Sequence, residues 1–300
     1  MPLTRDQLAD PKFAQAVARL QLRAREVVEG VISGGHRSPY HGFSVEFAQH
    51  REYAAGDEIR YIDWRAAARS DRLYVKEFEE ETNLKAYLLV DVSESMAYQG
   101  PGTPYSKRDY ASILAASIGS LLLQQRDATG LVVFSDEMQT YLPPRALASH
   151  YTQILEELIA AEARPRTDLG KTFHSLANEI GRRGLVMIFS DLFGPAEEIL
   201  HGLRHFRYRH HEVIVFQVLD DDEISFPFGQ LTRFEGLELE PALLVDPRGI
   251  QAEYLRQFSE FTRRMERDCL EMEVDLVRLN TRTPPEEALR DYLAGRARRR

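Results

Sequence analysis

The spacing of apolar residues changes along the chain and marks out its elements. Near the start, apolar residues recur at intervals of three and four: Phe13, Val17, Leu20, Ala24, Val27 and Val31. This period predicts an amphipathic helix over about residues 11–32, ended by Gly34 and Gly35. Residues 40–80 lack that period and are rich in Tyr, Phe, Val and Ile around turn signals, which predicts short antiparallel strands.

From residue 84 onward, continuous apolar runs alternate with helical stretches. The runs that predict buried strands are 86–90, 130–134, 185–189, 213–218 and 274–279. The intervening helices are predicted at about 106–126, 149–162, 169–182, 195–206 and 251–270. Apolar strands alternating with helices are typical of a parallel sheet covered on both faces. The sequence therefore predicts the α/β class, with a doubly wound, mostly parallel sheet.

These patterns predict one large domain with attachments. We expect residues 1–35 to hold the N-terminal helix, 36–82 a small antiparallel β subdomain, and 83–295 the α/β domain. Residues 220–250 break the alternation with strand and turn signals, and we expect them to join the β subdomain. Residues 296–300 are read as a solvated basic tail, since Arg296, Arg298, Arg299 and Arg300 end the chain.

Composition narrows the classes of function. The formal net charge of -9 argues against a general nucleic-acid partner, because neutralising phosphates requires clustered Lys and Arg. No apolar run approaches the ~20 residues that cross a bilayer, and the first residues lead into no signal-peptide core. We therefore expect a cytoplasmic protein without a membrane-spanning segment. A single cysteine, Cys269, excludes an internal disulfide.

Polar side chains follow two of the predicted strands at the point where each ends. Asp91 follows the strand 86–90 and leads into Ser93 and Ser95, while Asp191 follows the strand 185–189. In open α/β sheets, ligands bind outside the carboxyl ends of the strands, where the strand order reverses. Thr167 lies between these strands, in a loop that closes on a helix.

Carboxylate and hydroxyl oxygens, with no His or Cys nearby in the sequence, match Mg²⁺ or Mn²⁺ better than Zn²⁺. The sequence thus predicts one divalent ion. An octahedral Mg²⁺ would keep waters and one open position, which a carboxylate can fill. The predicted site residues are Asp91, Ser93, Ser95, Thr167 and Asp191.

A plainer interpretation is that Asp91, Ser93 and Ser95 cap a helix, because Asp and Ser are favoured at helix N-termini. Capping does not account for the Thr167 and Asp191 that follow in matching strand-end contexts. Asp168 is predicted to cap the helix that begins near residue 169.

The pattern Asp91-x-Ser93-x-Ser95, followed by Thr167 and Asp191, resembles the metal-ion-dependent adhesion site of von Willebrand factor A domains. The resemblance implies a von Willebrand factor A-like fold. It also implies that Ser93, Ser95 and Thr167 coordinate the ion directly, whereas Asp91 and Asp191 act partly through water.

The segments 38–47 and 51–64 resemble the signature of the bacterial "domain of unknown function 58" family. Together with the metal-site motif, the resemblance covers most of residues 30–220. It implies association with MoxR-type AAA+ ATPases, as an adaptor or co-chaperone. Many relatives carry membrane helices before this region, and none is recognised in this sequence.

We therefore expect a non-enzymatic, metal-dependent protein-binding module whose ion accepts an acidic residue of a partner, namely a MoxR-type ATPase or its client. Two alternatives stay open. The first is a Mg²⁺-dependent phosphohydrolase with Asp91 as nucleophile, although Ser93 stands where a second acid would protonate the leaving group. The second is a structural assembly protein whose metal site is empty.

Overall fold

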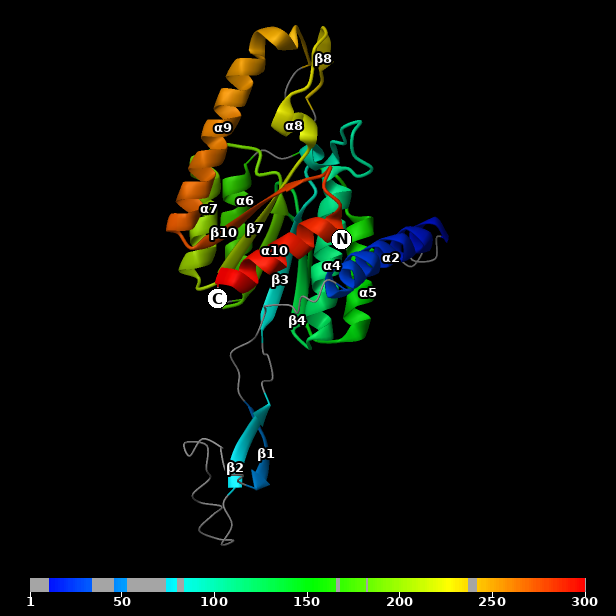
Figure 1. Ribbon diagram of the computed structural model, residues 1–300, viewed down its shortest axis with the longest axis vertical. Coiled ribbons are helices and arrows are strands. Elements are labelled where there is room, and N and C mark those ends of the chain that lie inside the picture. The colour runs from blue at the N-terminus through cyan, green and yellow to red at the C-terminus, as the bar shows by residue number, and fades with distance from the viewer. Residues whose placement is uncertain are drawn as a thin grey trace.

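A six-stranded sheet forms the centre of the protein, in a computed structural model that describes residues 11–33, 46–52, 74–79, 84–165, 168–181, 183–236 and 242–299 (Figure 1). The strands lie in the order β10-β7-β6-β3-β4-β5. Their bounds are β3 Lys85–Asp91, β4 Ala128–Phe134, β5 Met138–Arg145, β6 Leu185–Ser190, β7 Glu212–Leu219 and β10 Val274–Asn280. The five strands predicted from apolar runs are all present.

All neighbouring pairs in this sheet are parallel except β4 and β5, which are antiparallel. β5 was not predicted, because its residues are half-buried or exposed and form no apolar run. Pro143 and Pro144 also weaken its strand signal. Prolines are tolerated there because β5 is an edge strand, which has one side free of ladder hydrogen bonds.

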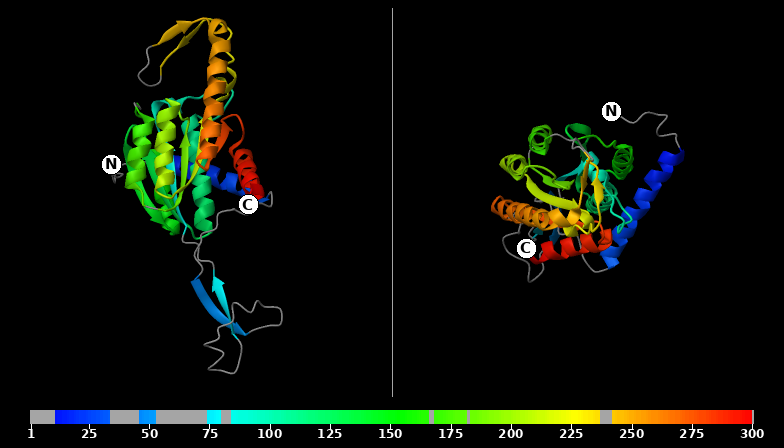
Figure 2. Two further views of the ribbon diagram at one scale, coloured as in Figure 1. Left: turned by 90° about the vertical axis from the view of Figure 1, so that its left-hand side faces the viewer. Right: turned by 90° about the horizontal axis from the view of Figure 1, so that it is seen from above.

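Helices cover both faces of the sheet (Figure 2). One face carries α2 (Pro11–Ser33), α4 (Lys107–Gln124), α5 (Ala148–Ala160) and α10 (Pro285–Arg299). The other carries α6 (Leu169–Glu179), α7 (Ala196–Tyr208) and α9 (Pro247–Glu271). In β3, Leu88 and Val90 belong to the first core and Tyr87 and Leu89 to the second. Burial on both sides explains the continuous apolar runs and confirms a mixed α/β fold.

The predicted N-terminal helix is present as α2 and packs mainly against α4 and α10. Its period of three and four places Leu20, Ala24, Val27 and Val31 in the core. The guanidinium of Arg290 on α10 donates to the carbonyl oxygen of Gly30 at 3.3 Å. None of the helices in the described ranges has the length and apolar character required to span a membrane.

Two small hairpins project from opposite ends of the α/β domain (Figure 1). β1 (Glu46–Glu52) pairs with β2 (Tyr74–Glu79), and β8 (Thr232–Phe234) pairs with β9 (Leu243–Val245). The expectation that residues 220–250 join the β subdomain is therefore wrong for these strands. β3 and β7 run parallel, so their amino ends lie at one edge of the sheet and their carboxyl ends at the other. The first hairpin precedes the amino end of β3, whereas the second follows the carboxyl end of β7, so the two lie at opposite edges.

The interpretation of residues 296–300 as a solvated tail is also wrong for its first residue. Helix α10 continues to Arg299, and Arg296 is only 9% exposed. The Arg296 guanidinium forms an ion pair with Glu212 and a second, at 3.5 Å, with Asp275. The composition of the tail did not reveal that strands β7 and β10 supply these carboxylates.

Helices α6 and α7 approach closely at Gly202, where an added Cβ would lie 2.6 Å from the Cβ of Phe173. Gly202→Ala should therefore destabilise the protein by about 1–3 kcal/mol through overpacking, measured by urea unfolding. The control is Gly295→Ala on α10, where no atom lies within 4 Å. It should stabilise the protein by up to about 1 kcal/mol, because alanine favours helix. Equal stability of the two variants would contradict this account of the α6–α7 contact.

Candidate functional site

The predicted site lies at the carboxyl edge of the sheet, where the direction of chain progression reverses. From β3 the chain continues through β4 and β5 on one side, and it returns to β6, β7 and β10 on the other. β3 and β6 are neighbours, so Asp91 at the end of β3 and Asp191 after β6 flank this reversal. Such a point is where open α/β sheets bind ligands.

Asp91 is fully buried and joins the two strand ends. Its Oδ1 accepts the backbone N–H of Ser93 at 2.9 Å, and its Oδ2 accepts the hydroxyl of Ser190 at 2.6 Å. Each oxygen thus takes part in a hydrogen bond that shapes the loop. Asp91 orients the polypeptide around the site as well as supplying negative charge.

Ser93 and Ser95 face each other in the loop that follows β3. Their Oγ atoms lie 3.1 Å apart, with Ser93 fully buried and Ser95 9% exposed. Ser93 precedes the short 3₁₀ helix η2 (Glu94–Ala97), but its side chain makes no capping hydrogen bond. The plainer interpretation as a helix cap therefore does not describe what the Ser93 hydroxyl does.

Thr167 lies outside the residues that the structure describes. The loop before it is anchored beside Ser93, because Arg164 exchanges backbone hydrogen bonds with its neighbours: its N–H donates to Val92 at 3.4 Å and its carbonyl accepts from Glu94 at 3.2 Å. Asp168 caps α6, and its Oδ1 accepts the N–H of Lys171 at 2.9 Å. The prediction for Asp168 is confirmed.

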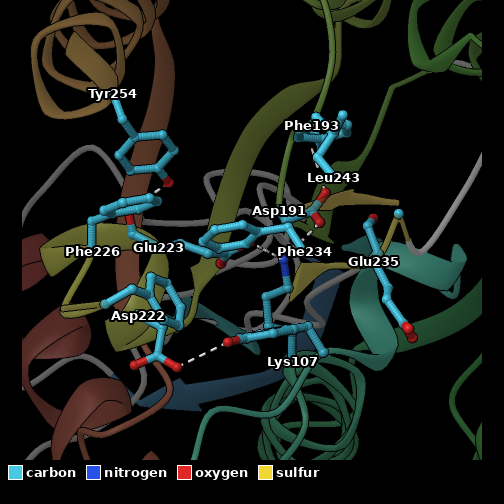
Figure 3. Close-up of a pocket in the computed structure, with 14 residues that line it drawn as sticks. Lys107, Asp191, Phe193, Asp222, Glu223, Phe226, Phe234, Glu235, Leu243 and Tyr254 are labelled. Atoms are coloured by element: carbon cyan, nitrogen blue, oxygen red, sulfur yellow. Dashed lines mark hydrogen bonds and ion pairs between the residues drawn. The ribbon is translucent and has the colours of Figure 1, made fainter. Parts of the chain in front are cut away.

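Asp191 is 4% exposed and contacts a buried cation that the sequence did not reveal. Its Oδ1 accepts the N–H of Phe193 at 3.0 Å, and its Oδ2 accepts from Nζ of Lys107 at 2.9 Å (Figure 3). Lys107 also donates to Oε1 of Glu223 at 2.6 Å, on α8 (Asp221–Ser225). The structure therefore links the start of α4, the end of β6 and α8 through one ammonium group.

Burial and charge act against each other in this triad. Burial alone lowers the pKa of Lys107, but the carboxylates of Asp191 and Glu223 outweigh it, so the pKa is raised and the amine stays protonated. Burial raises the pKa of Glu223, and the charge of Lys107 opposes that shift. Lys107 therefore stabilises the charged forms of both acids.

Two features of the sequence could have indicated that Lys107 and the residues after β7 belong to the site. Lys107 stands in the first turn of α4, where the helix dipole disfavours a cation, so a local carboxylate is needed to hold it. Asp220 follows β7 as Asp191 follows β6, which made residues 220–223 a third polar strand end. Asp220 accepts hydrogen bonds at 3.0 Å from the Gly100 N–H and from the hydroxyl of Thr281.

Ser95 belongs to the lining of a pocket of about 350 Å³, in which Figure 3 shows Lys107 and Asp191 close to Phe234. Ser95, Lys107 and Asp191 line one end of the pocket. The other end is lined by apolar and aromatic side chains from the segment that follows β7, namely Phe226, Phe228, Phe234, Leu243 and Tyr254. The pocket therefore has a polar part and an apolar part, and these five apolar and aromatic side chains are called the apolar wall below.

The donor set suits a hard divalent cation. Two neighbouring ligands of an octahedral ion at about 2.1 Å lie about 3 Å apart, and the Oγ atoms of Ser93 and Ser95 are 3.1 Å apart. When ionised, Asp91, Asp191 and Glu223 exceed the single charge of Lys107 by two, which a divalent ion would balance. Among the described residues no group of three or more His, Cys, Asp or Glu side chains is arranged to hold a metal.

Comparison with known families identifies the class of protein. A family model described as "Protein of unknown function DUF58" matches residues 49–267, most of the chain. The protein belongs to this family.

Several uncharacterized bacterial proteins are similar in sequence to this chain. Uncharacterized proteins of Mycobacterium tuberculosis and Mycobacterium bovis are 30% identical over 229 residues, covering 75% of this chain and 71% of theirs. The uncharacterized protein YeaD of Bacillus subtilis is 29% identical over 168 residues, which covers 53% of this chain and 39% of YeaD.

Two solved structures also show similarity. One is the conserved hypothetical protein BatB of Bacteroides thetaiotaomicron, with a TM-score of 0.42 and 15% identity, covering 72% of this chain and 99% of that one. The other is an aerotolerance-related membrane protein of Bacteroides fragilis, with a TM-score of 0.41 and 15% identity, covering 71% of this chain and 99% of that one.

Proposed function

We propose that this protein is a metal-dependent protein-binding module with a von Willebrand factor A-like fold. One Mg²⁺ or Mn²⁺ is held by Ser93 and Ser95, with Asp91 and Asp191 supplying negative charge and Thr167 a further hydroxyl. The ion leaves a coordination position to an acidic residue of a partner. The observation that carries this proposal is the pair of serine hydroxyls 3.1 Å apart, beside two buried carboxylates at the sheet's reversal point.

A phosphohydrolase with Asp91 as nucleophile has less support. The Asp91 side chain is fully buried, and both oxygens already accept hydrogen bonds, from Ser93 and Ser190. A nucleophile requires an oxygen that substrate can reach. Ser93 also stands where a second acid would be needed. Loss of phosphate-ester turnover in Asp91→Asn, if wild type showed such turnover, would favour the hydrolase.

Isothermal titration of metal-stripped protein with Mg²⁺ and Mn²⁺ tests the ion site. Ser95→Ala should weaken binding by at least about tenfold, since it removes one oxygen ligand while leaving both carboxylates in place. The matched control is Ser117→Ala, another buried serine, whose hydroxyl donates to the carbonyl oxygen of Ile113 within α4. It should bind the ion as wild type does.

Wild-type protein that binds neither ion would favour the structural alternative with an empty site. Equal binding by wild type and Ser95→Ala would show that the ion sits elsewhere. Circular dichroism of each variant separates a lost ligand from a lost fold.

The partner in this proposal is a MoxR-type AAA+ ATPase or its client, and the protein acts as an adaptor or co-chaperone. The support is the family resemblance of segments 38–47 and 51–64, together with the pocket that Ser95 lines. A pull-down of the purified ATPase by this protein should succeed in Mg²⁺ and fail in EDTA. Retention that is unchanged in EDTA and in Ser95→Ala would contradict a metal-bridged contact.

A further inference from the structure

The pocket beside the candidate ion site is larger than a single carboxylate group requires. Its volume of about 350 Å³ falls within the range of pockets that hold an organic ligand, which is about 300–1,000 Å³. A single carboxylate on an ion would occupy only the end formed by Ser95 and Asp191. Much of the remaining space lies against apolar and aromatic side chains, although Tyr98, Asp222, Glu223 and Glu235 also line it.

The apolar wall is a packed cluster and not a set of loose side chains. The ring of Phe226 lies 4.5 Å from Tyr254 and 5.8 Å from Phe234, measured between centroids. The hydroxyl of Tyr254 donates to the carbonyl oxygen of Glu223 at 2.8 Å, which fixes α9 to α8. Phe226 adopts a left-handed backbone conformation, with φ of 48°, that non-glycine residues seldom accept without compensating contacts. The wall is therefore preorganised.

The carboxylates around the pocket already have partners. Asp222 accepts from the hydroxyl of Tyr98 at 2.9 Å. Glu223 accepts from Lys107 at 2.6 Å and from the Asp220 N–H at 2.8 Å. These contacts hold the two carboxylates in place, and the apolar side chains of Phe226, Phe228 and Phe234 in the same lining suit an apolar group.

Two apolar side chains of the lining are also exposed to solvent. Phe193 is 57% exposed and Leu243 is 58% exposed, and both belong to the lining. Phe193 follows Asp191 by two residues, whereas Leu243 begins β9. A ligand that spans from the ion to β9 would cover both, and covering apolar surface favours binding.

We infer that the pocket takes a partner segment in which an acidic residue adjoins a large apolar one, such as leucine, methionine or phenylalanine. The acidic residue reaches the ion at Ser95, and the apolar side chain lies against Phe226, Phe234 and Leu243. This inference rests on the proposed function, because the divalent ion supplies the positive charge that draws the carboxylate.

Fluorescence anisotropy with labelled short peptides tests this pairing. The probes are a peptide with a central Asp-Leu and two twins in which Leu becomes Ser or Asp becomes Asn, each measured in Mg²⁺ and in EDTA. The Asp-Leu peptide should bind in Mg²⁺, and the Asp-Ser twin should bind about 10- to 100-fold more weakly, as expected for an unburied leucine. The Asn-Leu twin and the EDTA samples should show little binding.

Two exposed leucines provide a matched pair of protein variants. Leu243→Ser removes a lining residue and should weaken binding of the Asp-Leu peptide by about tenfold, while its affinity for Mg²⁺ stays as in wild type. Leu231→Ser changes a leucine that is 66% exposed and lies outside the lining, so it should leave both affinities unchanged.

The outcomes separate this inference from the proposed function. Equal Mg²⁺-dependent binding of the Asp-Leu and Asp-Ser peptides overturns the apolar partner and leaves the metal-dependent module standing. Binding that requires leucine and Leu243 but neither Asp nor Mg²⁺ overturns the paired recognition together with the proposed function. Failure of every peptide to bind a protein that holds Mg²⁺ overturns the inference alone.

Discussion

Replacing Lys107 with methionine should destabilise the protein by about 3–5 kcal/mol in EDTA near neutral pH. The Lys107 side chain is 1% exposed and forms ion pairs with Asp191 at 2.9 Å and Glu223 at 2.6 Å. Methionine fills much of the same space but leaves the buried carboxylate of Asp191 without its cation. Removing one partner of a buried pair is far more costly than the pair's own net contribution. Urea unfolding, analysed by linear extrapolation, measures the difference.

The control is Lys171→Met, which removes the same kind of side chain from a surface pair. Lys171 is 86% exposed and lies 2.8 Å from Asp168. Its replacement should change the stability by less than about 1 kcal/mol, because water and ions screen exposed pairs. If the two variants lost equal stability, the buried triad would not be a stabilising element of the fold.

Magnesium provides a second readout of the same variant. A divalent ion beside Asp91 and Asp191 can restore the positive charge that Lys107→Met removes. Mg²⁺ should therefore raise the melting temperature of Lys107→Met more than that of wild type, because the stabilisation grows with the logarithm of the ion's affinity for each protein. An equal shift in both proteins would show that Lys107 does not oppose the ion, and no shift in either would count against the site.

The strands and their polar ends could be predicted, because burial on both faces requires an uninterrupted run of apolar residues. A strand such as 185–190 must be apolar throughout, and the first polar residue after it marks the edge of the sheet. Asp91 and Asp191 were found in this way, and the structure places both at the reversal between β3 and β6. The helix α2 was predictable for a similar reason, since it packs only one face against the core.

Contacts between residues far apart in the sequence leave no comparable pattern of apolar and polar positions. Lys107 and Glu223 are separated by 116 positions, and only the folded sheet brings their elements together. Arg296 was taken for a free terminal charge, because Glu212 and Asp275 are distant in sequence. β5 was missed because an edge strand can be half polar. The position of the β8–β9 hairpin depends on the direction in which the sheet strands run, which composition alone does not indicate.

The protein should lose about 3 kcal/mol of stability through His211 as the pH falls from about 6.5 to about 4. His211 is fully buried immediately before β7, and its ring centroid lies 6.1 Å from that of Tyr87 and 6.3 Å from that of Phe206. Burial lowers the pKa of His211 from 6.5 to about 4; the backbone of Gly184 opposes the shift, while Arg209 and His210 add to it. The folded state thus binds fewer protons than the unfolded state in this range, so acid favours unfolding.

Carboxylates also titrate in this pH range and affect the stability. The variant His211→Leu separates the contribution of His211 from theirs. Urea unfolding of wild type and variant at a series of pH values should show a difference in stability that changes by about 3 kcal/mol between pH 6.5 and 4. His201→Gln, a change of an exposed histidine on α7, retains His211 and should keep the wild-type decline. A difference between wild type and His211→Leu that stays constant with pH would show that His211 is protonated as easily in the folded protein as in the unfolded chain.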